Sequence, residues 1–116
     1  MRSVTIEIPV KAQPKQSVRF GRYGAYPDPK KVQYINLLKL YMVKHKQKPL
    51  MSKNITLTIL LTFKGTPLGD LDNFCKSLLD SMKGIIIDDD RNVMMLSISK
   101  IYHAPEDKIA IMVEGE

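Results

Sequence analysis

Six of the twelve acidic residues of this 116-residue chain fall within one segment, residues 69–93. The first two are Asp70 and Asp72, in the sequence Asp-Leu-Asp-Asn, and the last three are consecutive, Asp88 to Asp90. Carboxylates crowded together repel one another and resist ionisation unless a cation lies among them. Aspartates that converge from two loops form the hard oxygen site that Mg²⁺ prefers. The segment therefore predicts metal-assisted phosphoryl chemistry.

Each part of this segment also has a plain structural interpretation. Asp72 could serve only as a helix N-cap, and Lys76 and Asp80 are spaced as a surface ion pair. Asp88 to Asp90 would suit a solvated turn. These interpretations together do not explain why a basic protein has half of its acidic residues within 21 positions.

Three other kinds of acidic site can be tested against the same residues. An EF-hand that starts at Asp88 needs Gly and Glu where the chain has Val93 and Ser99. An aspartyl phosphatase resembling the haloacid dehalogenases has its Asp-x-Asp directly after a strand, and it usually has Thr where this chain has Phe74. A nucleotide-sugar domain needs far more residues. None of the three fits.

The charge is divided unevenly along the chain. Residues 1–64 carry 13 Lys or Arg and two acids, whereas residues 65–116 carry five Lys or Arg and ten acids, for a net charge of +6. A basic region binds the phosphates of nucleic acid, and an acidic cluster can hold a metal ion. An enzyme that acts on nucleic acid needs both features.

Length and composition predict one small globular domain, residues 1–116, of ordinary hydrophobic content (44%). No apolar stretch approaches the length of a membrane span, and the N-terminus lacks a secretory apolar region. Cys75 is the only cysteine, so no internal disulfide is expected and packing is its expected role. A reducing cytoplasm is the expected location.

Hydrophobic periodicity predicts an α+β fold of order β-α-β-α-β-β, a mixed sheet packed with two helices. Asp28 and Asp72 are the expected N-caps, and Gly84 is the expected left-handed terminator of the second helix. The last two strands are expected to form an antiparallel hairpin. The predicted strands are residues 3–9, 54–63, 93–102 and 108–113, and the predicted helices are residues 29–46 and 73–83. The apolar face of the first helix is predicted to be Tyr34, Ile35, Leu37, Leu38, Tyr41 and Met42, and that of the second Phe74, Cys75, Leu78, Leu79 and Met82.

Residues 10–29 are predicted to form a long loop rich in cations and aromatic rings, followed by a helix with a basic face. Such a mixture suits a nucleic-acid strand, with phosphates on the cations and bases on the rings, although a solvated loop has the same composition. The loop contains Lys11, Lys15, Arg19 and Arg22 with Phe20, Tyr23 and Tyr26, and the helix continues with Lys30 and Lys31.

Several motifs in combination resemble the RusA family of Holliday junction resolvases, which are small dimeric endonucleases. The central motif is Asp70-Leu71-Asp72-Asn73-x-x-Lys76-x-x-x-Asp80, followed by Gly84 and by Asp89-Asp90-x-Asn92-Val93. Pro14-Lys15-x-x-x-Arg19-Phe20, Tyr26-x-x-Pro29-Lys30-Lys31 and Lys100 also have counterparts in that family. Nearly the whole chain is covered by the resemblance.

The resemblance implies specific roles for these residues. Asp70, Asp72 and Asp90 correspond to the catalytic aspartates that bind the metal, and Lys76 corresponds to the catalytic lysine. Asp80 and Asp89 match supporting positions. Lys15, Arg19, Arg22, Lys30, Lys31 and Lys100 are the expected DNA-binding residues. The implied cofactor is Mg²⁺, or Mn²⁺ in its place, with no organic cofactor, and the implied partners are a four-way DNA junction and a second copy of the chain, with no membrane.

The chain departs from the family pattern at three places. Asp88 makes a triple where the family has a pair, so Asp89 is the alternative third ligand. Asn92 stands where Gln is usual, and residues 65–68 lack the basic residues seen before the first aspartate in some members. Two other functions remain open at this point, an inactive DNA-binding protein of the same fold and a Mg²⁺-dependent phosphohydrolase of small nucleotides.

Overall fold

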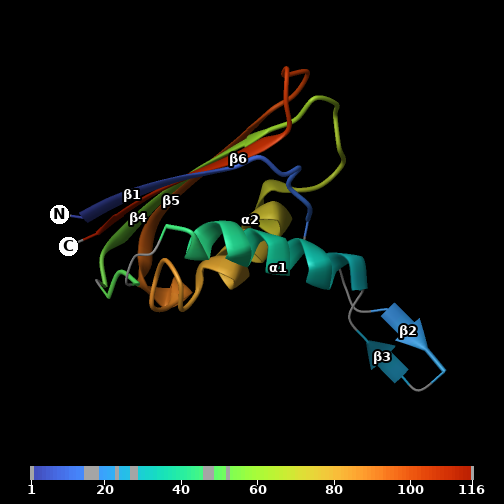
Figure 1. Ribbon diagram of the computed structural model, residues 1–116, viewed down its shortest axis with the longest axis horizontal. Coiled ribbons are helices and arrows are strands. Elements are labelled where there is room, and N and C mark those ends of the chain that lie inside the picture. Colours follow the sequence, from blue (N-terminus) through green and yellow to red (C-terminus); the bar gives the residue numbers. More distant parts are fainter. Residues whose placement is uncertain are drawn as a thin grey trace.

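The computed structural model describes residues 2–14, 19–22, 24–26, 29–45, 49–51 and 53–115. In chain order the elements are β1 (Arg2–Ile8), β2 (Arg19–Gly21), β3 (Gly24–Tyr26), α1 (Pro29–Val43), β4 (Ile55–Thr62), α2 (Leu71–Met82), the 3-10 turn η1 (Asp90–Asn92), β5 (Val93–Ile101) and β6 (Lys108–Gly115). Four strands form one sheet with both helices on one face, and the β2–β3 hairpin lies beyond the N-terminal end of α1 (Figure 1). The predicted α+β architecture is confirmed. None of the described helices is long and apolar enough to cross a membrane.

The strand order in the main sheet is β1-β6-β4-β5. β4 and β5 are parallel, and β6 lies antiparallel between β1 and β4. The prediction of a β5–β6 hairpin is therefore wrong. The link between these strands crosses the end of β4, where Ala104 N–H donates to the Phe63 carbonyl (2.9 Å) and Lys64 N–H donates to Asp107 Oδ1 (2.9 Å).

The core lies between the sheet and the two helices. Alternate residues of β4, from Ile55 to Leu61, are buried, as the alternation predicts. Cys75 is buried too, which confirms its packing role. On α1 the buried residues are Tyr34, Leu38 and Met42, whereas Leu37, predicted to face the core, is 40% exposed. Leu37 instead lines an open cavity between α1 and residues 10–13, which leaves its side chain partly in solvent.

The helix boundaries differ from the prediction by a few residues. α1 begins at Pro29 as expected but ends at Val43, earlier than the expected end near Lys46, because Lys44 and His45 form a turn. The expected cap Asp28 lies outside the described residues. α2 is capped by Asp70 and not by Asp72, because the N–H groups of Asn73 and Phe74 donate to the Asp70 carbonyl (3.1 and 3.2 Å). Gly84 has φ +81°, which confirms it as the left-handed terminator.

The segment predicted as one long loop contains the β2–β3 hairpin. Arg19 pairs with Tyr26, and Gly21 pairs with Gly24, whose φ is +109°. The strands are only three residues long, too short to show a period-two pattern in the sequence. Lys15 and the side chain of Arg19, two expected DNA-binding groups, lie outside what the structure describes.

Candidate metal and DNA site

Asp70 and Asp72 lie at the N-terminal end of α2, and both are exposed. The backbone carbonyl of Asp70 opens the helix, while its side chain makes no capping hydrogen bond to the described residues. Asp72 occupies the first turn. The positive end of the helix dipole stabilises negative charge at this place. Both carboxylates are therefore presented to solvent at a place that favours negative charge.

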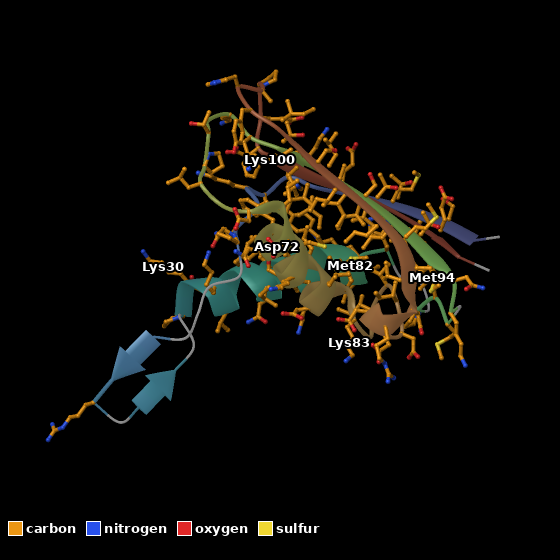
Figure 2. The ribbon with its side chains drawn as sticks, turned by 180° about the vertical axis from the view of Figure 1, so that it is seen from behind. Lys30, Asp72, Met82, Lys83, Met94 and Lys100 are labelled. Carbon is orange, nitrogen blue, oxygen red and sulfur yellow. The ribbon has the colours of Figure 1, made fainter. Side chains whose placement is uncertain are left out.

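The loop that delivers the chain to Asp70 is held by the end of β5. Lys100 Nζ donates to the Gly69 carbonyl (3.1 Å), and the Tyr102 hydroxyl donates to the Pro67 carbonyl (3.2 Å). Lys100 Nζ also lies 5.2 Å from the centre of the Tyr102 ring. In Figure 2, Asp72 lies below Lys100, and both lie well to the left of Met94. Lys100, expected to bind DNA, is half-buried in this structure and acts as a positioning residue for the loop.

The resemblance to RusA endonucleases implies cleavage of DNA, which the replacement of Lys100 by Met is expected to slow about tenfold without weakening DNA binding. Methionine retains much of the side-chain length but loses the charged hydrogen bond to Gly69, worth about 1.5–3 kcal/mol. Cleavage of DNA under single-turnover conditions, beside a binding titration, measures both effects. If Lys100 contacted DNA instead, affinity would fall and the slope of log affinity against log salt would decrease by about one.

Gly69 makes the close approach between this loop and α2 possible. Its φ is +148°, and a Cβ atom there would lie 2.8 Å from Phe74 Cε2. The Phe74 ring is fully buried and packs against Phe63, with ring centres 5.6 Å apart. The ring therefore has little room to move, and position 69 requires glycine.

Gly69→Ala is expected to lower the free energy of unfolding by about 2–4 kcal/mol, from backbone strain and overpacking. Urea denaturation measures this change. Gly65→Ala is the matched control, since a Cβ at Gly65 meets nothing within 4 Å. Equal stability of the two variants would show that the loop does not need its close contact with Phe74.

Lys76 and Asp80 follow Asp72 at intervals of four on α2, and both are exposed. Residues four apart on a helix lie on one face, one turn from the next. Lys76 therefore lies one turn from Asp72 on the same exposed face of α2, and its catalytic role stays a prediction.

The Asp88–Asp90 group lies at the other end of α2. Asp89 accepts hydrogen bonds from Arg91 N (3.0 Å) and Arg91 Nε (3.2 Å), and Lys83 Nζ lies 4.0 Å away. The hydrogen bond from the Arg91 backbone is the main cause that lowers the pKa of Asp89 to about 2. Asp90 is exposed and opens η1. Because Asp89 is occupied by Arg91 and Lys83, Asp90 is the stronger candidate for a metal ligand.

The two acidic groups are far apart within one chain. The carbonyl of Gly69, beside Asp70, accepts a hydrogen bond from Lys100 near the end of β5, whereas Asp90 opens the turn η1 that leads into the start of that strand. Nine residues of β5 span about 26 Å, and the twelve of α2 span about 18 Å. Figure 2 likewise shows Asp72, in the first turn of α2, well apart from Met94, near the start of β5.

One chain therefore carries the two acidic groups of the predicted metal site but does not bring them together around one ion. Carboxylate oxygens have the hard donor chemistry that suits Mg²⁺, and oxygens that share one ion lie within about 4 Å of one another. In the described part of the chain, no three Asp, Glu, His or Cys residues are grouped closely enough to hold an ion. The expected convergence of Asp90 with Asp70 and Asp72 is not formed within one chain.

A basic segment is tied to the Asp70 end of the molecule through Gln13. Lys31 Nζ donates to Gln13 Oε1 (3.0 Å), and Ser77 Oγ, on α2, donates to the Gln13 carbonyl (2.9 Å). Lys30 lies in the same first turn of α1, and Arg22 is exposed in the hairpin turn. The cations of α1 and the carboxylates of α2 therefore lie on two helices that are both hydrogen-bonded to Gln13.

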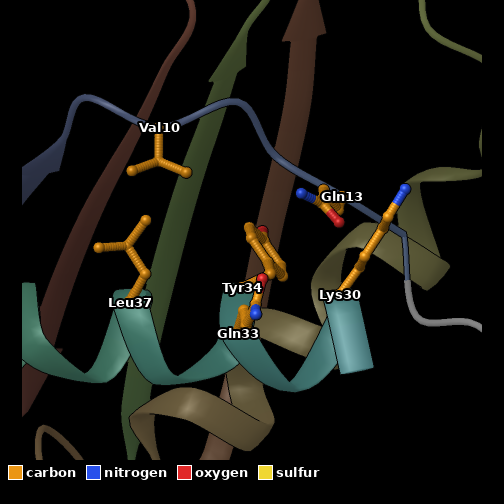
Figure 3. Close-up of a pocket in the computed structure, with 6 residues that line it drawn as sticks. All are labelled: Val10, Gln13, Lys30, Gln33, Tyr34 and Leu37. Atoms are coloured by element: carbon orange, nitrogen blue, oxygen red, sulfur yellow. The ribbon is translucent and has the colours of Figure 1, made fainter. Parts of the chain in front are cut away.

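A cavity of about 380 Å³ opens between residues 10–13 and α1 (Figure 3). Burial raises the pKa of the Tyr34 hydroxyl in its wall, so this group is neutral at physiological pH. Its lining residues are Val10, Gln13, Lys30, Gln33, Tyr34 and Leu37. The cavity wall therefore contains amide and hydroxyl groups beside the cation Lys30.

The sequence did not reveal Gln13, Ser77 or Tyr102 as residues that organise this site. Ser77 is 3% exposed within α2, and its position on the apolar face of the helix is the only sign of its role. Gln13 and Tyr102 act through side-chain or backbone contacts with residues distant in sequence, for which the local pattern carries no signal.

Comparison with known proteins agrees with the geometry. The family described as Endodeoxyribonuclease RusA matches residues 7–114. No curated protein sequence matches the chain. Because the matched region covers nearly the whole chain, the protein belongs to the RusA family of endodeoxyribonucleases.

Proposed function

We propose that this protein is a homodimeric, Mg²⁺-dependent endonuclease that resolves four-way DNA junctions by paired, symmetric nicks. The observation that carries the proposal is the pair of exposed carboxylates at the start of α2, joined through Gln13 to the basic start of α1. Membership in a family of endodeoxyribonucleases supports the reaction class. The proposed location of the reaction is the cytoplasm.

Asp70 and Asp72 would hold the metal ion from one subunit. The chemistry that a divalent ion supplies at such carboxylates is activation of water and stabilisation of charge on the leaving oxygen. Lys76, one turn along α2, stabilises the charge that develops on the phosphate. Lys100 and Gly69 keep the two aspartates in place by fixing the preceding loop.

Asp90 would complete the site from the second subunit. Within one chain Asp90 is separated from Asp70 by about the length of α2, roughly 18 Å. A twofold dimer that reverses the direction of α2 brings Asp90 of each copy toward Asp70 and Asp72 of the other. Two equivalent sites result, as paired nicking of a twofold-symmetric junction requires.

The cations of the N-terminal region would bind the DNA backbone. Lys30 and Lys31 open α1, Arg22 lies in the hairpin, and Lys15 and Arg19 precede them in sequence. Arg and Lys at such positions neutralise phosphates and release counterions. The polar lining of the cavity beside Lys30 offers further hydrogen-bond partners to a strand on this surface.

Binding measured at several salt concentrations tests the proposal. A four-way junction should bind more tightly than a linear duplex of the same sequence, and its affinity should fall steeply with salt as several phosphates are released. Hydrolysis of small nucleotides, measured in parallel, should be undetectable. A shallow salt dependence together with nucleotide hydrolysis would instead indicate a phosphohydrolase of small substrates, and tight junction binding without cleavage would indicate an inactive DNA-binding protein.

A further inference from the structure

Leu68 has the most exposed large hydrophobic side chain in the part of the chain that the structure describes. Its exposed fraction is 92%, whereas the next highest values, those of Met51 and Met95, are 67%. It lies in the link between β4 and α2, two residues before Asp70. In Figure 1 this link arches outward beyond the end of the sheet. Single exposed apolar residues are ordinary on protein surfaces, so exposure alone assigns no role to Leu68.

The backbone on both sides of Leu68 is held in place by the end of β5 and the residue after it. The Pro67 carbonyl accepts a hydrogen bond from the Tyr102 hydroxyl (3.2 Å), and the Gly69 carbonyl accepts one from Lys100 Nζ (3.1 Å). With both neighbouring carbonyls fixed, Leu68 cannot turn into the core unless one of these hydrogen bonds breaks. The fold therefore presents this apolar side chain to solvent from a fixed backbone.

The chain around Leu68 offers no cation to a DNA backbone, since residues 65–75 contain no Lys or Arg. The charged groups that follow Leu68 are the exposed carboxylates of Asp70 and Asp72, which repel phosphate unless a metal ion lies between them. A leucine side chain gains free energy only by covering apolar surface. Contact between Leu68 and a DNA strand is therefore favourable only where the strand exposes the faces of its bases.

The faces of the bases are accessible only where their stacking is interrupted. Within a duplex each face is covered by the next base pair, and an inserted leucine must first unstack the two pairs. At the crossover of a four-way junction the strands pass from one stack to another, so the base pairs that flank it separate more easily. The cost of opening is smallest where pairing or stacking is already disturbed. An apolar side chain beside the reaction centre can therefore distinguish a junction from a duplex without hydrogen bonds to the bases.

We propose that Leu68 is a selectivity residue, whose side chain inserts between the base pairs at the crossover of a bound four-way junction. The inference rests on the proposed function and names the group by which the site tells a junction from a duplex. Leu68 precedes Asp70 by two residues, and two residues of extended chain span at most about 7 Å. A phosphate bound at Asp70 therefore brings the neighbouring base step close to Leu68. The side chain stabilises the opened step by covering base faces that have lost their stacking partner.

Fluorescence of 2-aminopurine placed beside the crossover reports the insertion directly, because this base analogue brightens when it is unstacked. The measurement is made in EDTA, so that no strand is cut. Wild-type protein and L68M are expected to raise the emission, whereas L68A and L68N are expected to give about half of that rise or less. Asparagine is close to leucine in size but is polar, so L68N separates the need for an apolar group from the space that the side chain fills.

Junction affinity provides the second measurement. L68A is expected to bind the junction about tenfold more weakly than wild type, since alanine buries much less apolar surface. Its duplex affinity and the salt dependence of its binding should not change, because no phosphate contact is lost. L40A is the matched control, because Leu40 is 62% exposed on α1 and the same change there should leave fluorescence and affinity at wild-type values. Urea denaturation should give equal stability for L68A and wild type, which excludes a loss of loop structure.

An L68A protein with wild-type junction affinity and an undiminished rise in fluorescence would overturn the proposal. An equal loss of affinity for junction and duplex would also overturn it, since Leu68 would then be a general DNA contact. Wild-type protein that neither binds nor cuts the junction would contradict the proposed function and this inference with it. Junction cleavage by wild type, with no difference between L68A and L40A, would keep the function and contradict the role of Leu68 alone.

Discussion

Asp70→Asn is expected to lower the rate of junction cleavage about a thousandfold and to change junction affinity by less than about threefold. Asparagine has nearly the same shape and keeps the backbone carbonyl that opens α2. It removes the negative charge that a divalent ion needs. Loss of about 4 kcal/mol of transition-state stabilisation corresponds to the stated factor. Single-turnover cleavage measures the rate, and a binding titration in EDTA measures the junction affinity.

Glu106→Gln is the matched control for this variant. Glu106 is an exposed carboxylate whose partner is Lys108 (3.5 Å), in the link between β5 and β6. The same chemical change there should leave both cleavage and affinity at the wild-type values. Normal cleavage by the Asp70→Asn protein would remove Asp70 from the site and with it the proposed reaction centre.

A mixture of Asp70→Asn and Asp90→Asn subunits is expected to recover nicking that neither protein has alone. If each site combines Asp70 and Asp72 of one copy with Asp90 of the other, the mixed dimer has one intact site and one site with both changes. About half of randomly assorted dimers are mixed, so roughly a quarter of the wild-type nicking should return. The product should be a single nick and not a pair, because only one site per dimer is active.

The control for this experiment mixes Asp70→Asn with Asp72→Asn. These residues belong to the same part of the site, so every site in the mixed dimer carries a change and no activity should return. Co-expression with two different affinity tags provides the mixed dimers. Failure of the first mixture to recover nicking, with both parent proteins inactive, would mean that the three aspartates do not combine across subunits.

Much of the fold is predictable from local patterns in the sequence. The alternation in β1 and β4, the start of α1 at Pro29 and the terminator Gly84 all depend on neighbouring residues, and all are confirmed. The pairing of β6 with β1 and β4 cannot be predicted from neighbouring residues in the sequence. It depends on which strand is apolar enough to lie inside the sheet, with another strand along each edge. Ile109, Ile111 and Val113 are almost fully buried and need neighbours on each side, whereas β5 tolerates an edge.

The candidate site is predictable in composition but not in arrangement. The acidic residues lie close together in sequence, and this closeness suggests one cluster. The length of α2 separates them, and β5 then leads the chain back to the loop before Asp70. The sequence also does not reveal which charged side chains form hydrogen bonds within the chain. Asp89 is held by Arg91, and Lys100 is held by Gly69, through contacts that only the structure shows.

Cleavage of a synthetic four-way junction, beside a linear duplex of the same sequence, tests the central claim most directly. Each DNA is incubated with the wild-type protein in Mg²⁺ and in EDTA, and all four strands of the junction are labelled in turn. The account predicts paired nicks in two opposed strands of the junction, in Mg²⁺ alone, with the duplex left intact. Equal cutting of junction and duplex, or cutting that continues in EDTA, would contradict it.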